Sequence, residues 1–133
     1  MIFARAPWML LACGLVLALP LSSKAHPPAQ DEVLIEIGVR LVAAEAEAEA
    51  KASQLGERHP ELILARTRAR FLAERAARLS PLPPSLRGEL VRRLRLELLT
   101  LQRDRLDLQA RYRDKHPQMV RLDRQIQVYE RYV

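Results

Sequence analysis

The chain has 133 residues, enough for one domain, and it carries 22 basic and 16 acidic side chains, for a formal charge of +6. Only 4 residues are glycine and 5% are aromatic, which argues against an all-β sandwich and against glycine-rich nucleotide-binding folds. Leucine, alanine, arginine and glutamate dominate, as they do in long helices and coiled coils. A single cysteine excludes an intramolecular disulfide and any cysteine-based zinc site.

Residues 1–25 have the pattern of a secretory signal peptide. Arg5 gives a positively charged start, residues 8–21 are largely apolar, and small residues including Ala25 precede a predicted cleavage before His26. The apolar stretch is short for a membrane-spanning helix, which needs about 20 apolar residues. We therefore expect a periplasmic protein. The alternative is an uncleaved segment that anchors the chain in the inner membrane.

Cys13 lies inside this apolar stretch and raises the alternative of a lipid-tethered envelope protein. A lipoprotein cysteine should close the apolar stretch, but residues 14–19 continue it, so an ordinary apolar residue is the better reading. Without residues 1–25 the chain contains no cysteine. Its charges of both signs are interspersed, which does not indicate a nucleic-acid-binding surface.

Prolines divide the remaining chain into an extended leader at 26–30, a helix at 31–79, a turn at 80–84 and a helix at 85–133. Asp31 and Ser85 are the predicted N-caps. Both long segments carry apolar residues at heptad spacing, which predicts a coiled coil. The expected fold is therefore all-α: a long antiparallel two-helix coiled-coil hairpin covering residues 31–133.

The five-residue turn requires the two long helices to run antiparallel. When facing residues are chosen so that their numbers sum to 163, apolar residues meet in most layers. Ile37 then faces Ile126, and Leu62 faces Leu101.

Pro60 and Pro117 interrupt otherwise helical stretches, and each follows a histidine. The heptad pattern continues in phase through both prolines, so we predict local kinks within continuous helices. The alternative is four shorter helices, in which each His-Pro pair begins a new helix with proline at its first position.

The two long segments also resemble each other. A shift of 57 residues places His59-Pro60 on His116-Pro117 and brings the heptads into coincidence. This predicts duplication of one helical unit. Heptad constraints shared without duplication are the alternative explanation.

A second apolar stripe lies off the heptad seam. Each such side chain gains about 1.5–3 kcal/mol if it is buried, so an exposed stripe predicts self-association of two hairpins into a four-helix dimer. The predicted self-association residues are Ile35, Val42, Ile63, Leu99, Leu106 and Val120, with Leu96 and Phe71 also off the seam.

Residues 108–126 read Leu-Gln-Ala-Arg-Tyr-Arg-Asp-Lys-His-Pro-Gln-Met-Val-Arg-Leu-Asp-Arg-Gln-Ile. This stretch resembles the periplasmic coiled coil of polysaccharide chain-length determinant and exopolysaccharide-transport proteins, the polysaccharide co-polymerases. That family has two membrane helices that flank a periplasmic α/β base, whereas this sequence has one hydrophobic segment and no such base. The resemblance implies a related coiled-coil module beside polysaccharide export, without co-polymerase activity.

No P-loop, GxSxG, HExxH or Rossmann glycine pattern occurs in the sequence. His59 and His116 are too far apart in the expected hairpin to share a metal ion within one monomer. His26, as the new N-terminus, could chelate copper with its amine and imidazole, but it has no second histidine nearby. We therefore predict a protein that is not an enzyme and that has no cofactor and no metal site.

The expected function is that of a secreted coiled-coil interaction or scaffold protein of the bacterial envelope, accessory to polysaccharide export. We expect a homodimer that binds an envelope protein, with no nucleic acid, and with membrane attachment only if the N-terminal segment is retained. The alternative is a small periplasmic helical chaperone or stress sensor of the Spy-like kind. The run Leu99-Thr100-Leu101-Gln102 is similar to the Leu-Thr-x-x-Gln of that family.

Overall fold

The structure is a computed structural model that describes residues 28–79 and 81–133. These residues form four helices and no strand: α1 (Pro28–Ala52), α2 (Pro60–Arg78), α3 (Pro84–Gln109) and α4 (Pro117–Glu130). The described chain is therefore all-α, as its composition predicts. The predicted signal peptide at 1–25, with Cys13, lies outside the described residues.

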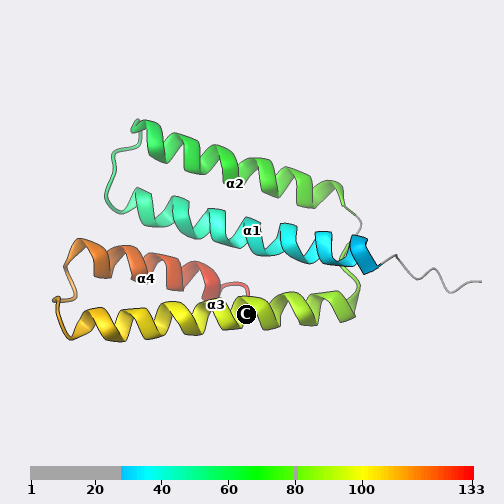
Figure 1. The fold of residues 1–133 in the computed structure, drawn as a ribbon. Helices are drawn as coiled ribbons and strands as arrows, with labels where there is room; N and C mark the ends of the chain where they lie inside the picture. Colours follow the sequence, from blue (N-terminus) through cyan, green and yellow to red (C-terminus); the bar gives the residue numbers. More distant parts are fainter. Residues whose placement is uncertain (1–27, 80) are drawn as a thin grey trace, which may run out of the picture.

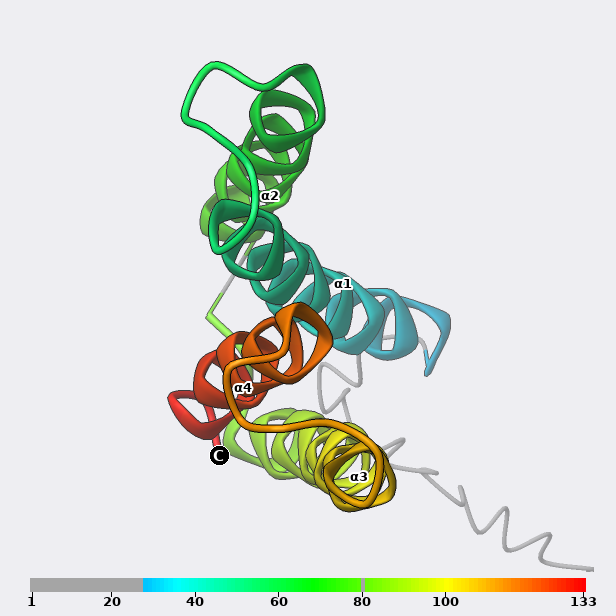
Figure 2. The same cartoon turned by 90° about the vertical axis from the view of Figure 1, so that its left-hand side faces the viewer.

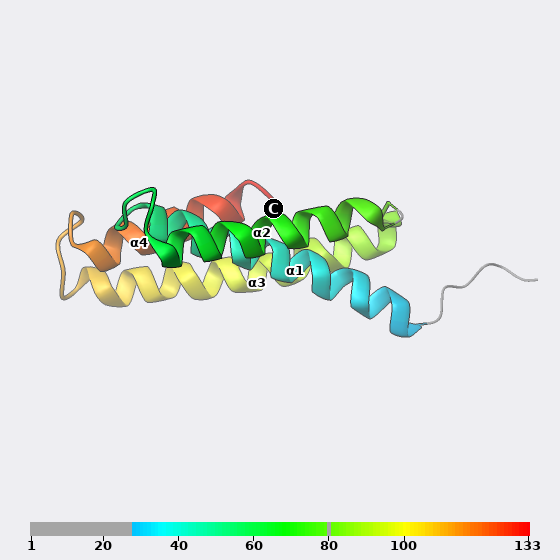
Figure 3. The same cartoon turned by 90° about the horizontal axis from the view of Figure 1, so that it is seen from above.

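The helices form two antiparallel hairpins, α1 with α2 and α3 with α4 (Figure 1). Viewed down the helix axes, α2, α1 and the second hairpin lie side by side in a row (Figure 2). α1 packs on all three other helices, whereas α2 packs on α1 alone among the described helices. The two connections within the hairpins lie at the same end of the molecule (Figures 1 and 3). The central helix is thus α1.

Each predicted long helix ends before its His-Pro pair, and a new helix starts there. His59 and His116 have extended backbones, with φ −68°, ψ 131° and φ −62°, ψ 137°, and serve as N-caps. Their Nδ1 atoms accept hydrogen bonds from the amides of Glu61 at 3.2 Å and Gln118 at 3.3 Å. The predicted kinks at Pro60 and Pro117 are therefore wrong. Proline has no N–H to give to a preceding turn, but it is well suited to the first position of a helix.

The predicted pairing of two 49-residue helices fails for residues 60–78. α2 folds back onto α1 and does not contact α3, so Leu62 is buried without meeting Leu101. The other half of the pairing is kept, since α1 packs along α4, the helix that contains Ile126. The Nε2 of Gln54 donates a hydrogen bond of 2.8 Å to the carbonyl oxygen of Pro117, which ties the first connection to the start of α4.

Two other predicted helix starts are displaced by prolines. α1 begins at Pro28, inside the predicted leader at 26–30 and ahead of Asp31. α3 begins at Pro84 with Pro83 as its N-cap, so Ser85 lies inside the helix. In both cases a proline takes an early helical position, where its missing N–H costs nothing.

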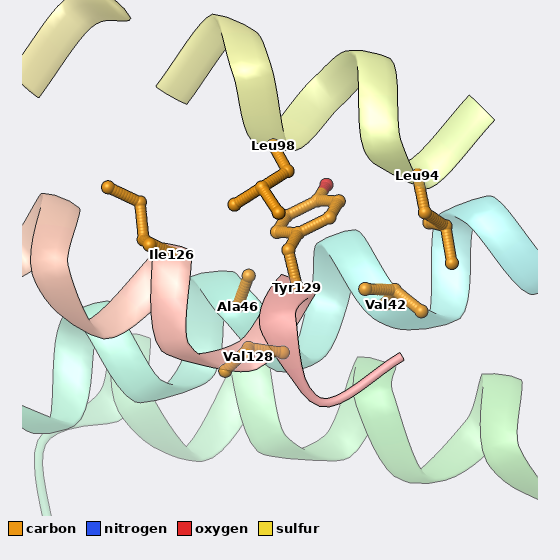
Figure 4. Close-up of a cluster of buried hydrophobic side chains, with 7 residues drawn as sticks. All are labelled: Val42, Ala46, Leu94, Leu98, Ile126, Val128 and Tyr129. Atoms are coloured by element: carbon orange, nitrogen blue, oxygen red, sulfur yellow. The ribbon is translucent and has the colours of Figure 1, made fainter. Parts of the chain in front are cut away.

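The main core lies between α1 and the second hairpin (Figure 4). Gly38 allows α1 to approach α3 closely, because a Cβ at this position would lie 2.8 Å from Cδ2 of Leu90. Each fully buried side chain of the core contributes about 1.5–3 kcal/mol. The buried cluster consists of Val42, Ala46, Leu94, Leu98, Ile126, Val128 and Tyr129, with Val39, Leu90, Leu101 and Leu122 packed against it.

The two hairpins are built to the same plan. α1 and α3 end at Ala52 and Gln109, and α2 and α4 begin at Pro60 and Pro117, so the equivalent positions are 57 residues apart. Both connections run for seven residues, 53–59 and 110–116. The chain is therefore a tandem pair of helical hairpins, and the shift of 57 residues relates one to the other.

Candidate interaction surface

The side of α3 that faces away from the core is both apolar and basic. Leu99 and Leu106 are 61% and 65% exposed, and Leu96 is 52% exposed. At 3.6 residues per turn, three arginines fall on the same side of the helix as these leucines. We call this surface the α3 outer face, and it consists of Arg92, Arg95, Leu96, Leu99, Arg103 and Leu106.

The arginines of the α3 outer face are only partly neutralised. Arg92 pairs with Glu89 at 2.7 Å, and Arg103 contacts Asp104 at 3.3 Å. Hydrogen bonds from Arg92 and Arg93 lower the pKa of Glu89 to about 2, so this carboxylate stays charged. Arg95 has no ion pair with any residue of 28–79 or 81–133. The face therefore presents positive charge around its leucines.

A shallow groove runs between the two helices of the first hairpin. Phe71, which is 61% exposed, lies along it beside Leu72, and small alanines of α1 form the facing wall. Small residues keep this wall low, which leaves the aromatic ring uncovered. We call this site the α1–α2 groove, and it is lined by Arg40, Ala43, Ala44, Glu47, Arg68, Phe71 and Leu72.

The predicted self-association residues do not form one surface. Ile35 and Val42 are buried within the chain, because they lie on the side of α1 that packs on the second hairpin. They are therefore not available to another molecule. Leu99, Leu106 and Ile63 are exposed, but Ile63 lies on α2 and the two leucines on α3. Val120 is partly buried on α4.

Two exposed features of the first hairpin were not predicted from the sequence. They are the α1–α2 groove and Val33, which is 57% exposed on α1. The shift of 57 residues pairs Phe71 with the buried Val128, and Val33 with Leu90. That comparison marks both residues as positions that are covered in one hairpin and uncovered in the other.

The C-terminal residues lie against α1. The Tyr132 hydroxyl donates a hydrogen bond of 2.6 Å to Oε2 of Glu45. Burial, followed by this bond to a carboxylate, raises the pKa of Tyr132 to about 12. Arg93 of α3 pairs with Glu32 of α1 at 2.8 Å. These bonds join the second hairpin to α1 at two places, in addition to the bond between Gln54 and Pro117.

The histidines of the described chain act as helix caps, and the rings of Tyr112 and His116 stack with centroids 3.9 Å apart. Within residues 28–79 and 81–133, no three side chains of His, Cys, Asp or Glu come together as a metal site would require. No helix in this part of the chain is long and apolar enough to cross a bilayer.

No protein-family model, curated protein or solved structure matches the chain. The α3 outer face and the α1–α2 groove are therefore the features of the molecule that suggest a function.

Proposed function

We propose that the protein is a non-enzymatic helical interaction protein of the bacterial envelope, which docks other proteins on the exposed sides of its outer helices. The observation that carries this proposal is the α3 outer face, where Leu99 and Leu106 are each more than 60% exposed. Large apolar side chains clustered on one side of a helix are typical of docking surfaces.

The chemistry of the face describes the partner that it suits. The leucines of this face follow one another at spacings of three and seven residues, so a partner helix with an apolar stripe can pack against them. Arg95 and its neighbouring arginines favour carboxylates at the rim of such a contact. The preferred partner is a protein with an apolar ridge bordered by acidic residues.

An envelope location is supported by the signal-peptide pattern of residues 1–25. N-terminal sequencing of the protein isolated from the periplasm should begin at His26. A chain that retains its first residues and fractionates with the inner membrane would favour the anchored alternative instead.

A place beside polysaccharide export is supported by the resemblance of residues 108–126 to the co-polymerase coiled coil. Deletion of the gene should alter the length distribution of the surface polysaccharide, and the full-length chain should restore it. An unchanged distribution in the deletion strain would remove this part of the proposal and leave the docking function standing.

A chaperone is the second candidate, and α2 favours it. Ile63, Leu64 and Phe71 are all more than half exposed on a helix that carries five arginines and two glutamates. A basic surface with several apolar patches suits unfolded clients of varied sequence. Purified protein that suppresses aggregation of a denatured client at substoichiometric amounts would favour the chaperone hypothesis over the scaffold hypothesis.

Site-specific photo-cross-linking tests the docking function. A photoreactive phenylalanine at position 99 should give discrete cross-linked species in the periplasm, whereas the same residue at the exposed Gln127 of α4 should not. Leu106→Glu should weaken cross-linking from position 99, because it places a charge in the same face. Equal cross-linking from positions 99 and 127 would overturn the proposal.

A further inference from the structure

We infer that the partner of the α3 outer face is the α1–α2 groove of a second copy of this chain, so that the hairpins stack between molecules as they do within one. This inference rests on the proposed function and assigns the partner.

The stacking within the chain supplies the pattern. α1 contributes Val42 to the buried cluster that also contains Val128 of α4, and Val39 and Leu101 pack against this cluster. The second hairpin thus provides a receiving surface between α3 and α4, and α1 is the helix that it receives (Figures 2 and 4).

Apart from Leu106, whose counterpart Glu49 is exposed, the residues of the α3 outer face are the counterparts of the side of α1 that packs on the second hairpin, which we call the inserting side. Leu99 corresponds to Val42 and Leu96 to Val39 under the shift of 57 residues. Val42 is 2% exposed and belongs to the core, whereas Leu99 is 61% exposed. The second hairpin therefore carries an inserting side, but the chain contains no third hairpin to receive it within its described residues.

The α1–α2 groove is the counterpart of the receiving surface. Phe71 corresponds to Val128, Leu72 to Tyr129 and Ala44 to Leu101. Val128 and Tyr129 are buried by α1, whereas Phe71 is uncovered. Val33 extends the same relationship along α1, since its counterpart Leu90 packs against the core.

One inserting side and one receiving side are therefore both open on the same molecule. In repeat proteins each unit buries its apolar face only against a neighbouring unit, and the chain ends normally need polar caps. Here both end surfaces carry large exposed apolar side chains between charged ones. A second copy is the occupant that fits, because it carries the same pair of surfaces that already pack together once within the chain.

The contact between molecules differs from the internal one in charge and in closeness. Arg95 replaces Gly38, so α3 cannot approach the groove as closely as α1 approaches α3. The groove offers Glu47 to an incoming arginine, but Arg40 and Arg68 also line it, and Glu47 is paired with Lys51 at 3.1 Å. The long side chain of Arg95 suits the wider spacing, because its apolar stem can pack in the contact while its charge stays in solvent.

The internal ion pair of Glu32 with Arg93 does not repeat, because its counterparts are Glu89 and Glu36. Each of these carboxylates has its own cation, since Glu89 pairs with Arg92 and Glu36 pairs with Arg40 at 2.7 Å. The stacking between copies therefore depends on the apolar contacts, and we expect it to be weaker than the internal contact.

A mixing experiment with two charge variants tests this arrangement. Leu99→Glu removes the inserting side and keeps the groove, whereas Phe71→Glu removes the groove and keeps the inserting side. Each variant alone should self-associate about tenfold or more weakly than the wild type in sedimentation velocity. An equimolar mixture should form a 1:1 complex that grows no further, because only one complementary pair of surfaces remains.

Leu64→Glu is the matched control. Leu64 is 51% exposed on the same helix as Phe71, but it does not line the groove and its counterpart Arg121 is exposed. This variant should associate like the wild type. Far-UV circular dichroism checks that the variants keep their helices, and Leu99→Gln repeats the test if Leu99→Glu loses helix.

Three results would overturn the inference. A wild-type chain that stays monomeric at high concentration would show that the contact between copies does not form. If position 99 of that chain still cross-links to a different protein, the proposed docking function stands without the stacking. Undiminished association of Phe71→Glu would point to a symmetric contact between two α3 outer faces. An equimolar mixture that stays monomeric would show that the two surfaces do not meet.

Discussion

Val42 of α1 and Leu99 of α3 occupy the same position in the two hairpins, yet Val42 is 2% exposed and Leu99 is 61% exposed. The difference arises because α1 has the second hairpin on that side, while α3 has nothing there among the described residues. Equivalent positions in a repeat thus receive unequal burial when the repeat occurs only twice.

Truncation of a buried and of an exposed leucine of α3 should lower the free energy of unfolding by unequal amounts. Leu94 is 1% exposed, so Leu94→Ala should lower the free energy of unfolding by about 2–5 kcal/mol. Leu99→Ala should change it by about 0.5 kcal/mol or less in dilute solution, because Leu99 is exposed. Urea denaturation at low protein concentration measures both values. Equal losses would mean that α3 turns a different side to the core.

Removal of a histidine cap should destabilise the helix that it begins. His116→Ala deletes the Nδ1 acceptor of the Gln118 amide and should cost about 0.5–2 kcal/mol. His116→Asn supplies another side-chain acceptor and should retain most of the stability. Thermal unfolding followed by circular dichroism compares the two variants, and identical melting curves would argue against the capping role.

Gly38 and Gly88 provide a matched pair of helix positions. A Cβ at Gly88 meets nothing within 4 Å, so Gly88→Ala should stabilise the protein by about 0.5–1 kcal/mol through helix propensity. A Cβ at Gly38 meets the methyl groups of Leu90, so Gly38→Ala should be less stable than Gly88→Ala by about 1 kcal/mol or more. Two variants of equal stability would contradict the close approach of α1 to α3.

Alkaline pH should weaken the attachment of the C-terminus. The pKa of Tyr132 is raised from 10.0 to about 12 in the folded chain, so folding favours the protonated hydroxyl. The corresponding stability is fully present below about pH 10 and is lost as the pH rises towards 12. Burial also raises the pKa of Tyr129, which adds to the loss in the same direction.

Tyr132→Phe separates the two tyrosines. This variant lacks the bond to Glu45, so its stability should fall less steeply than that of the wild type between pH 10 and 12. Denaturant midpoints at several pH values measure the slope. A wild type and a variant with the same slope would remove Tyr132 from the account.

The sequence predicted helix faces better than it predicted helix partners. Residues at the expected seam positions of the last three helices are buried, including Leu62, Leu94 and Met119. Heptad spacing depends only on which side of a helix is apolar, so it survives any change of partner. α1 and α4 also bury off-seam residues, such as Val42 and Val128, because each of these helices packs on more than one other helix.

The break at each His-Pro pair was missed for a geometrical reason. Each connection is seven residues long, so the heptad phase on either side is the same as in an unbroken helix. Phase alone cannot distinguish a seven-residue turn from one heptad of helix. The local evidence for a break is the His-Pro pair, in which the histidine caps a new helix and the proline takes its first position. The alternative of four shorter helices, which rests on this pair, is confirmed.

Cysteine labelling at positions 42 and 99 tests the account most directly, in a chain whose Cys13 is replaced by serine. At low protein concentration, Leu99→Cys should react as fast as an exposed thiol. Val42→Cys should react at least about a hundredfold more slowly, because its thiol is reached only when the core opens. At high concentration the reaction at position 99 should slow, while a cysteine in place of Leu64 should keep its rate. Equal rates at 42 and 99 would contradict the unequal burial of the two hairpins, and a concentration-independent rate at 99 would contradict the stacking of copies.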